Sequence, residues 1–587
     1  MRTFWRLLGF LRPYRGGVIA SFVLAAAAMA MGVLVPYLVG RTIDEIRHGG
    51  ANLWPLAGAV AAAGLLRLAF SVVRRLLAGR VSLGVEYDLR NRMYTHLQSL
   101  ELGFFDGQQT GQLMSRSTVD LQGVRFFLGY GLIFMAQSAL TIVIAAAVML
   151  ALNVPLALVA LAPMPFVIYV AFRYGLKNRP ASQEVQQRIA ELTAEAEENV
   201  SGVRVVKAFA QEPRQLRRFE GVVRRVFDQS MVSTRLQAFY SPFIGFLPQI
   251  GLALILLVGG RQAINGDITV GEFVAFYGYV LMLTGPMRIF GIALGMAQRA
   301  VASGARVFEI LDREPRLTAP PGAPDLPEGG GRVELRGVSF AYDGGEPVLR
   351  DVDLDVEAGR TVALVGGTGS GKTTLVALIP RLYDVDEGAM LVDGADVRSV
   401  DIGSLRREIA MVSDDAFLFS ATLRDNIAYA RPDASDEEVA EATRRAGLTE
   451  VLDELPAGYD TLVGERGHTL SGGQRQRVAI ARALLAAPRI LILDDATSSV
   501  DATTEGLIKE ALREVMAGRT TFVIAHRLST IALADEIVVL EEGRVLARGN
   551  HDELLESSPL YAEIAEKGLP DQVFLNRKPE EREVAGL

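Results

Sequence analysis

The 587-residue chain contains no cysteine and only five histidines, and its charges are spread along its length. Without cysteine it can form no disulfide, no thiolate metal site and no cysteine nucleophile. The histidines are scattered, which disfavours a zinc site. The 60 basic and 68 acidic side chains give a net charge of −8, so nothing favours nucleic acid as a partner. A chain of this length is expected to hold at least two structural units.

Charge is missing altogether from long stretches of the first half. Four runs contain no Asp, Glu, Lys or Arg: residues 16–40, 126–152, 154–172 and 236–260. Each is near or above the ~20 residues that cross the hydrocarbon core of a bilayer. Two further apolar runs, 53–73 and 268–294, are interrupted by Arg67 and by Glu272 and Arg288, respectively. We therefore predict six transmembrane helices in a multi-pass membrane domain.

The first apolar run is not a cleaved secretion signal, because it is longer than the apolar core of such a signal. The preceding MRTFWRLLGFLRPYRGG is typical of a basic amphipathic helix on the membrane surface. We expect the chain to stay anchored.

Arginine and lysine mark one side of the membrane. The polar connection after the second run begins with Arg74, Arg75 and Arg80, and the one after the fourth begins with Arg173, Lys177 and Arg179. The positive-inside rule places both connections and both termini in the cytoplasm. Apolar residues at three- and four-residue spacing predict that both connections are helices continuing out of the membrane. Residues 104–120 and 202–213 interrupt them, and a short crosswise helix could lie at each break.

A proline- and glycine-rich linker, residues 313–332, follows the membrane domain of residues 1–312. In residues 333–569, apolar strand-like runs alternate with helical patterns, which predicts an α/β domain with a largely parallel sheet. Residues 570–587 are charged and are expected to form a loosely ordered tail.

The stretch GGTGSGKT follows the strand-like run TVALV and precedes a helical pattern, the context that a phosphate-binding loop requires. Its glycines let backbone N–H groups surround phosphate oxygens, Lys372 reaches the terminal phosphates, and the Thr373 hydroxyl binds Mg²⁺. A second apolar run, ILILD, places Asp494 where its carboxylate can hold the magnesium water shell. The predicted ATP and Mg²⁺ site includes Gly366, Gly367, Thr368, Gly369, Ser370, Gly371, Lys372, Thr373 and Thr374.

From Gly331 to about Gly568 the chain resembles the nucleotide-binding domain of an ATP-binding-cassette (ABC) transporter, whose signature LSGGQ stands at residues 470–474. With the preceding spans and projections, nearly the whole chain resembles a half-transporter of the multidrug or lipid exporter type. The resemblance implies a dimer of halves, in which the phosphate loop of one half and the signature of the other enclose each ATP. The signature residues are Ser471, Gly472, Gly473 and Gln474, at the start of a helix whose N-terminal N–H groups favour an anion.

The same resemblance implies further roles. Tyr342 would stack on adenine, and His526 would donate a hydrogen bond to the γ-phosphate. The stretch SSVD, residues 498–501, would bridge the two nucleotide-binding domains, and GERG, residues 464–467, would touch the projecting helices of the partner half. The crosswise helices would be the coupling helices.

Two positions depart from the family pattern. Asp495 follows the magnesium-binding aspartate, where active members usually carry Glu; its carboxylate is one methylene shorter, so it is drawn back from the attacking water by about an ångström. Asp414 replaces a glutamine that contacts Mg²⁺ and water. We expect slow hydrolysis at this site, with an intact signature that serves a better site on another chain. The leading interpretation is a heterodimer with a catalytically competent half.

Two alternatives stay open: a homodimeric exporter with slow hydrolysis, and an ATP-gated membrane protein that does not pump. The expected location is a bacterial inner membrane with the nucleotide-binding domain in the cytoplasm. The expected substrate is hydrophobic or amphiphilic, drug-like or lipid, with peptides and siderophores as alternatives. Polar residues within the spans could line its path, because unpaired polar atoms are costly in lipid. They are Arg67, Gln137, Ser138, Gln249, Tyr277 and Arg288. Arg67 could instead snorkel to the inner headgroups.

Overall fold

A computed structural model describes residues 2–49, 52–464, 467, 469–494, 502–525 and 528–567. It divides the chain into two compact units. Met1–Gln98 and Thr110–Arg313 form the membrane unit, and Ser99–Gln109 and Glu314–Leu587 form the nucleotide unit. The short segment Ser99–Gln109 therefore groups with the second unit, although the chain before and after it belongs to the first.

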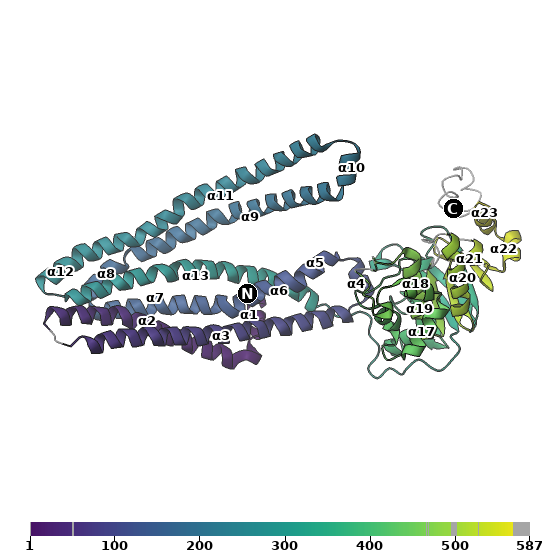
Figure 1. The fold of residues 1–587 in the computed structure, drawn as a ribbon, viewed down its shortest axis with the longest axis horizontal. Helices are drawn as coiled ribbons and strands as arrows, with labels where there is room; N and C mark the ends of the chain where they lie inside the picture. The colour runs from purple at the N-terminus through teal and green to yellow at the C-terminus, as the bar shows by residue number, and fades with distance from the viewer. Residues whose placement is uncertain are drawn as a thin grey trace. The chain divides into compact units, whose positions relative to one another are not determined.

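Helices make up the described part of the membrane unit (Figure 1). They are α1 (Arg2–Gly9), α2 (Arg15–Arg47), α3 (Trp54–Ser99), α5 (Thr110–Ser115), α6 (Leu121–Phe126), α7 (Leu132–Leu152), α8 (Val154–Leu161), α9 (Pro163–Ser201), α10 (Val203–Ala208), α11 (Glu212–Leu254), α12 (Gly260–Asn265) and α13 (Val270–Leu311). Three π-helical turns, Arg116–Asp120, Phe127–Gly131 and Ile255–Gly259, join neighbouring helices.

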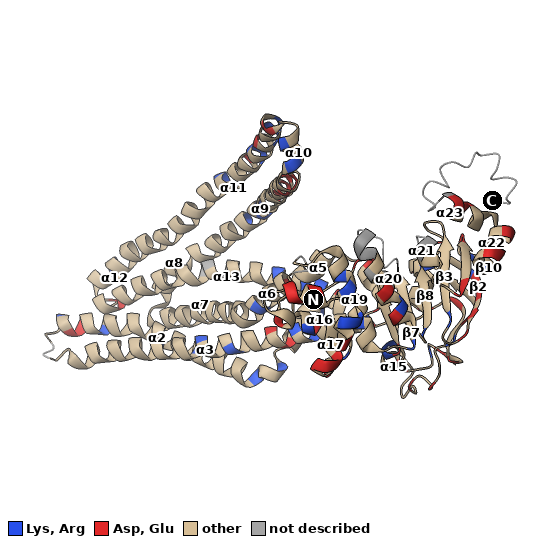
Figure 2. Ribbon diagram, turned by 45° about the vertical axis from the view of Figure 1, so that its right-hand side comes forward, with Lys and Arg blue, Asp and Glu red and all other residues tan. Residues whose placement is uncertain are grey.

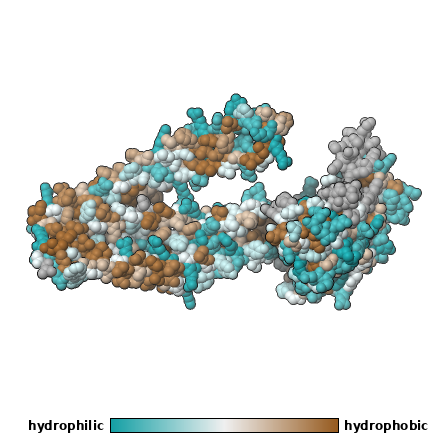
Figure 3. All heavy atoms as spheres, in the orientation of Figure 1, coloured by the Kyte–Doolittle hydropathy of each residue, from teal (hydrophilic) through white to brown (hydrophobic). Residues whose placement is uncertain are grey.

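Within the described residues, five continuous helical stretches are long and apolar enough to cross a membrane: Arg12–Arg47, Trp54–Ser99, Thr110–Leu152, Val154–Ser201 and Glu212–Asn265. They include the first five predicted spans, except for Leu53 at the start of the second. The sixth, residues 268–294, coincides largely with α13 and stays a prediction. Charged residues are sparse along α7, α8 and α12 and gather toward α10 (Figure 2), and hydrophobic side chains cover the region around α2, α8 and α12 (Figure 3).

The long helices extend past the apolar runs, as the sequence predicts. The helix α3 has 46 residues, about 70 Å at 1.5 Å per residue, whereas the hydrocarbon core measures about 30 Å. Both breaks contain a short helix, α4 (Leu102–Asp106) and α10 (Val203–Ala208). The first begins two residues before the predicted break.

The N-terminal helix α1 packs on the end of α13. Leu7 is buried, and a Cβ atom at Gly304 would come within 2.9 Å of its Cδ1 atom, so glycine leaves room for the leucine. The Arg6 guanidinium donates two hydrogen bonds to Asp312, at 2.6 and 2.5 Å, and lies 3.8 Å from the centre of the Phe308 ring. We call this contact the N-terminal clamp.

The nucleotide unit is built on two sheets. The strands are β1 (Val333–Phe340), β2 (Leu349–Val356), β3 (Thr361–Gly366), β4 (Glu387–Val392), β5 (Ala395–Asp396), β6 (Ile409–Val412), β7 (Ile490–Asp494), β8 (Thr520–Ile524), β9 (Glu536–Glu541) and β10 (Arg544–Gly549). A four-stranded antiparallel sheet has the order β2-β1-β4-β5, and a six-stranded sheet has the order β10-β9-β3-β8-β7-β6, parallel except for β10. The predicted α/β domain with a largely parallel sheet is confirmed.

Helices connect these strands. They are α14 (Lys372–Leu378), α15 (Ile402–Arg407), α16 (Leu423–Ile427), α17 (Asp436–Arg445), α18 (Thr449–Glu454), α19 (Gly472–Ala486), α20 (Ala502–Met516), α21 (Leu528–Ile531), α22 (His551–Ser557) and α23 (Pro559–Lys567). Alternate residues of the parallel strands enter two cores, as a sheet buried on both faces requires. In β7, Leu491 and Leu493 face the core that contains α17, α19 and α20, whereas Ile490 and Ile492 face the core that contains α14 and the antiparallel sheet.

Candidate nucleotide-binding site

The predicted phosphate loop leaves the carboxyl end of the fully buried strand β3 and enters α14. A Cβ atom at Gly366 would lie 2.1 Å from the carbonyl oxygen of Leu540, so only glycine fits there. Gly371 has φ of +97°, and a Cβ atom would lie 2.7 Å from Leu349 Cδ2. Backbone conformation and close packing therefore both demand glycine at Gly371.

Lys372 is 6% exposed, and its ammonium group is held by the loop itself. The Nζ atom donates to the carbonyl oxygens of Gly366 at 2.9 Å and Gly367 at 2.8 Å, and to Ser370 Oγ at 3.3 Å. Burial lowers the pKa of Lys372 to about 8, although the charge of Asp494 opposes this shift. The loop thus holds a desolvated cation that an anionic ligand would stabilise.

The candidate magnesium ligands lie at the same edge of the six-stranded sheet. Asp494 ends β7, Thr373 follows β3 in the first turn of α14, and Asp414 is an exposed residue two positions after β6. Because these strands are parallel, their carboxyl ends meet at one edge. The loop that carries Asp414 is tied to α19, since the Gln476 amide donates to Ser413 O at 3.2 Å.

A carboxylate and a hydroxyl are the oxygen ligands that Mg²⁺ prefers, so these residues fit the ion. In the part of the chain that the structure describes, no group of three or more His, Asp or Glu could hold a metal. At this edge Thr373 and Asp494 would hold the ion, and Mg²⁺ that binds with nucleotides also takes ligands from phosphate oxygens and water.

Tyr342 lies beside the phosphate-loop helix. Its side chain is 40% exposed, and its hydroxyl is 3.0 Å from Thr374 Oγ1. Its ring meets Phe340 edge to face, with the ring centres 4.9 Å apart. A half-exposed aromatic ring is thus fixed next to the phosphate loop, where a planar ligand can stack on it.

The predicted signature caps the start of α19. Ser471 Oγ accepts from Gln474 N at 3.3 Å, and Gln474 Oε1 accepts from Ser471 N at 2.8 Å, which forms a capping box. Gly473 is buried, whereas Ser471 is exposed. The 15-residue helix therefore presents an exposed N-terminus.

Other predicted site residues lie outside the described residues: Asp495, His526, Glu465, Arg466 and residues 498–501. The interpretation of Asp495 rests on the sequence alone.

The polar residues of the predicted substrate path differ in their surroundings in the membrane unit. Arg67 packs beside Gly32 of α2, where a Cβ atom would lie 3.6 Å from the guanidinium. The Gln137 amide is 3.7 Å from Met29 Sδ, and its buried Oε1 atom has no hydrogen-bond partner within the described chain. Ser138 is buried, whereas Gln249 and Tyr277 are exposed; the side chain of Arg288 lies outside the description.

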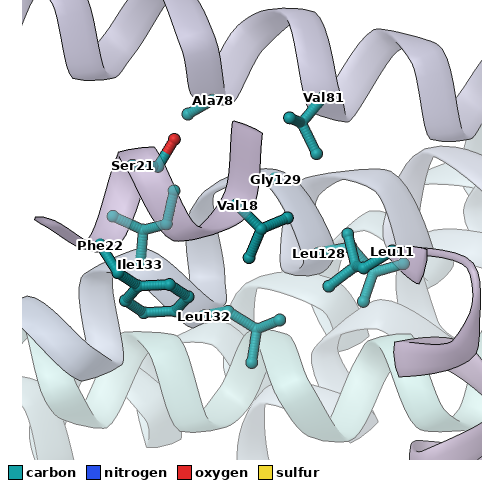
Figure 4. A pocket seen from close by; sticks show the side chains of 10 residues that line it. All are labelled: Leu11, Val18, Ser21, Phe22, Ala78, Val81, Leu128, Gly129, Leu132 and Ile133. Carbon is teal, nitrogen blue, oxygen red and sulfur yellow. The ribbon is translucent and has the colours of Figure 1, made fainter. Parts of the chain in front are cut away.

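A small apolar cavity lies elsewhere in this unit, between α2, α3 and the start of α7 (Figure 4). Leu11, Phe22, Val81 and Leu128 help to line it, and the Ser21 hydroxyl, which also lines it, is buried without a hydrogen-bond partner in the described part of the chain.

Comparisons with known proteins assign both halves of the chain. The ABC transporter transmembrane region matches residues 18–287, and the ABC transporter domain matches residues 349–498. The ATP-dependent lipid A-core flippase of Syntrophus aciditrophicus is 39% identical over 568 residues, which cover 96% of this chain and 94% of that protein. The bacterial Atm1-family ABC exporter with ATP bound is a similar structure, with a TM-score of 0.78 and 29% identity over 94% of this chain and 98% of that one.

A third relative is longer. The multidrug efflux ATP-binding/permease protein of Mycobacterium tuberculosis is 40% identical over 593 residues, and this chain spans only 50% of its length. The fold and these matches define an ABC exporter, a class of membrane protein that couples ATP hydrolysis to transport. The chain belongs to the ABC transporter family, and its match to the transmembrane region precedes its match to the ABC transporter domain.

Proposed function

We propose that this chain is one half of an ATP-driven exporter that moves a hydrophobic or amphiphilic substrate, drug-like or lipid, across a bacterial inner membrane. The observation that carries the proposal is a phosphate loop with a buried lysine on the same chain as five helical stretches, among the described residues, that are long and apolar enough to cross a membrane. The named activities of the relatives, multidrug efflux and lipid A-core flipping, support the substrate class. The proposed domains are the membrane domain 1–312, the linker 313–332, the nucleotide-binding domain 333–569 and the tail 570–587.

In the proposed site, the phosphate loop binds the triphosphate of ATP. Lys372 exchanges its carbonyl partners for phosphate oxygens, and the backbone N–H groups of the loop donate to the remaining ones. Thr373 and Asp494 hold Mg²⁺, which neutralises phosphate charge when it is bound, and Asp414 lies at the same edge. Tyr342 stacks on the adenine ring. The exposed start of α19 gives its N–H groups to the γ-phosphate at the site of a partner half.

The surfaces of the two units support a dimer of halves. At the tip of the α9–α11 hairpin, Val203, Val205 and Phe209 are 46%, 62% and 71% exposed. The nucleotide unit exposes an aromatic patch of Phe417, Phe419 and Tyr429, at 52%, 41% and 55%. We propose that the tip of each half docks on this patch of the other half, so that apolar surface on both is removed from water.

We further propose that the partner is a different half. Asp495 is too short to align the attacking water well, so the site formed by this phosphate loop hydrolyses ATP slowly, while the intact signature completes a competent site on the partner. The length of the mycobacterial relative, which has room for two such halves in one chain, is compatible with an assembly of unlike halves.

ATP turnover of the purified chain alone tests the heterodimer. The proposal expects weak hydrolysis that rises when the competent half is added. Robust hydrolysis by the purified homodimer would contradict it.

Two alternatives give different results. If the chain is a homodimeric exporter in which Asp495 is a slow base, Asp495→Glu raises its turnover about tenfold or more, because the longer side chain restores the position of the water. If it is an ATP-gated channel, ATP only dissipates a substrate gradient across vesicles, whereas an exporter builds one.

A further inference from the structure

The segment Ser99–Gln109 is anchored in the nucleotide unit, next to its sheets (Figure 1). Leu100 and Phe104 are 8% and 6% exposed, so two of its four large apolar side chains are buried, whereas Leu102 and Phe105 are partly exposed. Glu101 is also buried, and its Oε2 atom accepts from the backbone N–H of Arg316 at 3.1 Å. The segment is joined along the chain to α3 on one side and to α5 on the other.

One side chain of the nucleotide-binding domain joins this segment to the predicted adenine site. The Tyr383 hydroxyl donates to Asp106 Oδ2, at the end of α4, at 2.6 Å. The ring of Tyr383 is perpendicular to that of Tyr342, with the ring centres 5.3 Å apart. Tyr342 in turn contacts Thr374 of the phosphate-loop helix. A continuous path of contacts therefore runs from α14 through two tyrosines to α4.

The loop that carries Tyr383 is held firmly. Arg381, 3% exposed, donates to Asp384 Oδ1 at 2.6 Å and to the carbonyl oxygen of Thr318 at 3.2 Å. Arg406 donates to the carbonyl oxygens of Pro380 at 3.0 Å and Arg381 at 2.7 Å. Because this loop follows α14 directly, a shift of the helix or of Tyr342 displaces the Tyr383 hydroxyl rather than being absorbed by a flexible linker.

We propose that Tyr383 is a positioning residue that links base stacking at Tyr342 to the docking of the segment Ser99–Gln109. The inference rests on the proposed function, since it requires that Tyr342 stacks on the adenine of ATP. A base on the exposed face of Tyr342 fixes that ring, the edge contact fixes Tyr383, and the hydroxyl then holds Asp106 in one place. The base, and not only the triphosphate, stabilises the docked segment.

Hydrogen exchange of residues 99–109 tests the relay, with the full-length protein in lipid nanodiscs and Mg²⁺ present. ATP is expected to slow exchange in this segment of the unsubstituted protein. In Tyr383→Phe, which keeps the ring and removes only the hydroxyl, the ATP-induced protection falls about tenfold, as expected for one hydrogen bond to a carboxylate. Asp106→Ala gives the same loss. Tyr94→Phe is the matched control, because Tyr94 is 68% exposed on α3 and outside the relay.

Two further measurements separate the relay from a merely structural effect. In the double variant Tyr383→Phe with Asp106→Ala, protection falls no further than in either single variant, because both remove the same bond. Inorganic tripolyphosphate, which occupies the phosphate loop but has no base, leaves residues 99–109 unprotected at saturation. ATP affinity, measured by calorimetry, is recorded for every variant.

The possible results are distinct. Equal protection in Tyr383→Phe and the unsubstituted protein, protection by tripolyphosphate, or additive losses in the double variant would each overturn the relay. Because coupling is reciprocal, ATP affinity in Tyr383→Phe falls by no more than protection does; a larger loss of affinity would overturn the relay, because Tyr383 would then act on binding by itself. Failure of the proposed function looks different: the unsubstituted protein would not bind ATP at all.

Discussion

The two units differ in how their buried polar groups are satisfied. In the nucleotide unit, Lys372 and Arg381 are almost fully buried, and each donates to carbonyl or carboxylate oxygens of its own unit. In the membrane unit, buried oxygen atoms of Ser21, Gln137 and Gln262 have no hydrogen-bond partner among the described residues. Each such atom carries a cost of desolvation.

The two units also differ in how much of their apolar surface is exposed. In α3, only 6% of the apolar 18-residue segment is buried, against 28–33% for the corresponding segments of the other four candidate spans. Strand β3, by contrast, is buried along its whole length. The buried polar groups described in the nucleotide unit thus find hydrogen-bond partners within that unit. The membrane unit, in contrast, contains a helix with few contacts to the rest of the same chain. A second half and the bilayer are what this surface is suited to contact.

The largest expected effect is a loss of ATP affinity when the buried cation of the nucleotide unit is removed. Lys372→Ala removes the buried cation and its bonds to the loop, so ATP affinity falls by about a hundredfold or more, as expected for the loss of a charge-assisted contact. Calorimetric titration with ATP measures it. Lys177→Ala, an exposed lysine of the membrane unit, serves as control; equal losses in both variants would show that the buried lysine has no special role.

Next in size is the loss of the hydrogen bonds of a buried arginine. Arg381→Met leaves Asp384 and two carbonyl groups without their donor, and lowers the free energy of unfolding of the nucleotide unit by about 2 kcal/mol. Hydrogen exchange of the strands of the nucleotide unit at increasing denaturant concentration measures this change. Arg398→Met breaks the more exposed pair with Asp396, which is 2.7 Å apart, and costs under about 1 kcal/mol. If both variants lower the free energy of unfolding equally, the hydrogen bonds of the buried arginine contribute no more than those of the exposed one.

A smaller effect follows from the pKa of Lys372, which is about 8 without nucleotide. Bound phosphate raises the pKa of Lys372. ATP binding is therefore accompanied by the uptake of a proton whenever Lys372 of the free protein is deprotonated. ATP affinity is therefore constant below pH 8 and weakens about tenfold per pH unit above it, up to the ordinary lysine value. Titrations between pH 7 and pH 9.5 measure the slope. In Lys372→Arg, whose charge is permanent, the slope should vanish.

The smallest effect concerns the membrane unit. Ser21→Ala removes an unpaired hydroxyl from the cavity and raises thermal stability in detergent slightly, by less than about 1 kcal/mol. Thr141→Val lowers it, because Thr141 Oγ1 donates to the carbonyl oxygen of Gln137 at 2.8 Å. A loss of stability in Ser21→Ala would show that the hydroxyl has a partner in the assembled protein.

Local patterns in the sequence predicted much of this architecture. The charge-free runs predicted the spans, because transfer of charge into lipid is costly wherever it occurs. Glycines with lysine and threonine at fixed spacing predicted the phosphate loop, and Ser471 with Gln474 formed the expected start of a helix.

Contacts between distant parts of the chain were not predictable. Nothing in RLYDV indicates that Tyr383 meets Asp106, since 277 residues separate them. The grouping of Ser99–Gln109 with the nucleotide unit was likewise not predicted, because the sequence assigned residues 1–312 to the membrane domain and placed the break at 104–120. In the sequence, Arg381 cannot be distinguished from a surface arginine; only the folded structure shows that its side chain is buried.

The N-terminal clamp has a consequence for synthesis. Arg6 and Asp312 are 306 residues apart, and at about 5–20 residues per second the ribosome takes roughly 15–60 s to make the chain between them. During that time α13 is not yet available as a packing partner, so α1 remains undocked at the membrane surface. The clamp can therefore form only once α13 has been synthesised, so α1 reaches its final place late in the folding of the membrane unit.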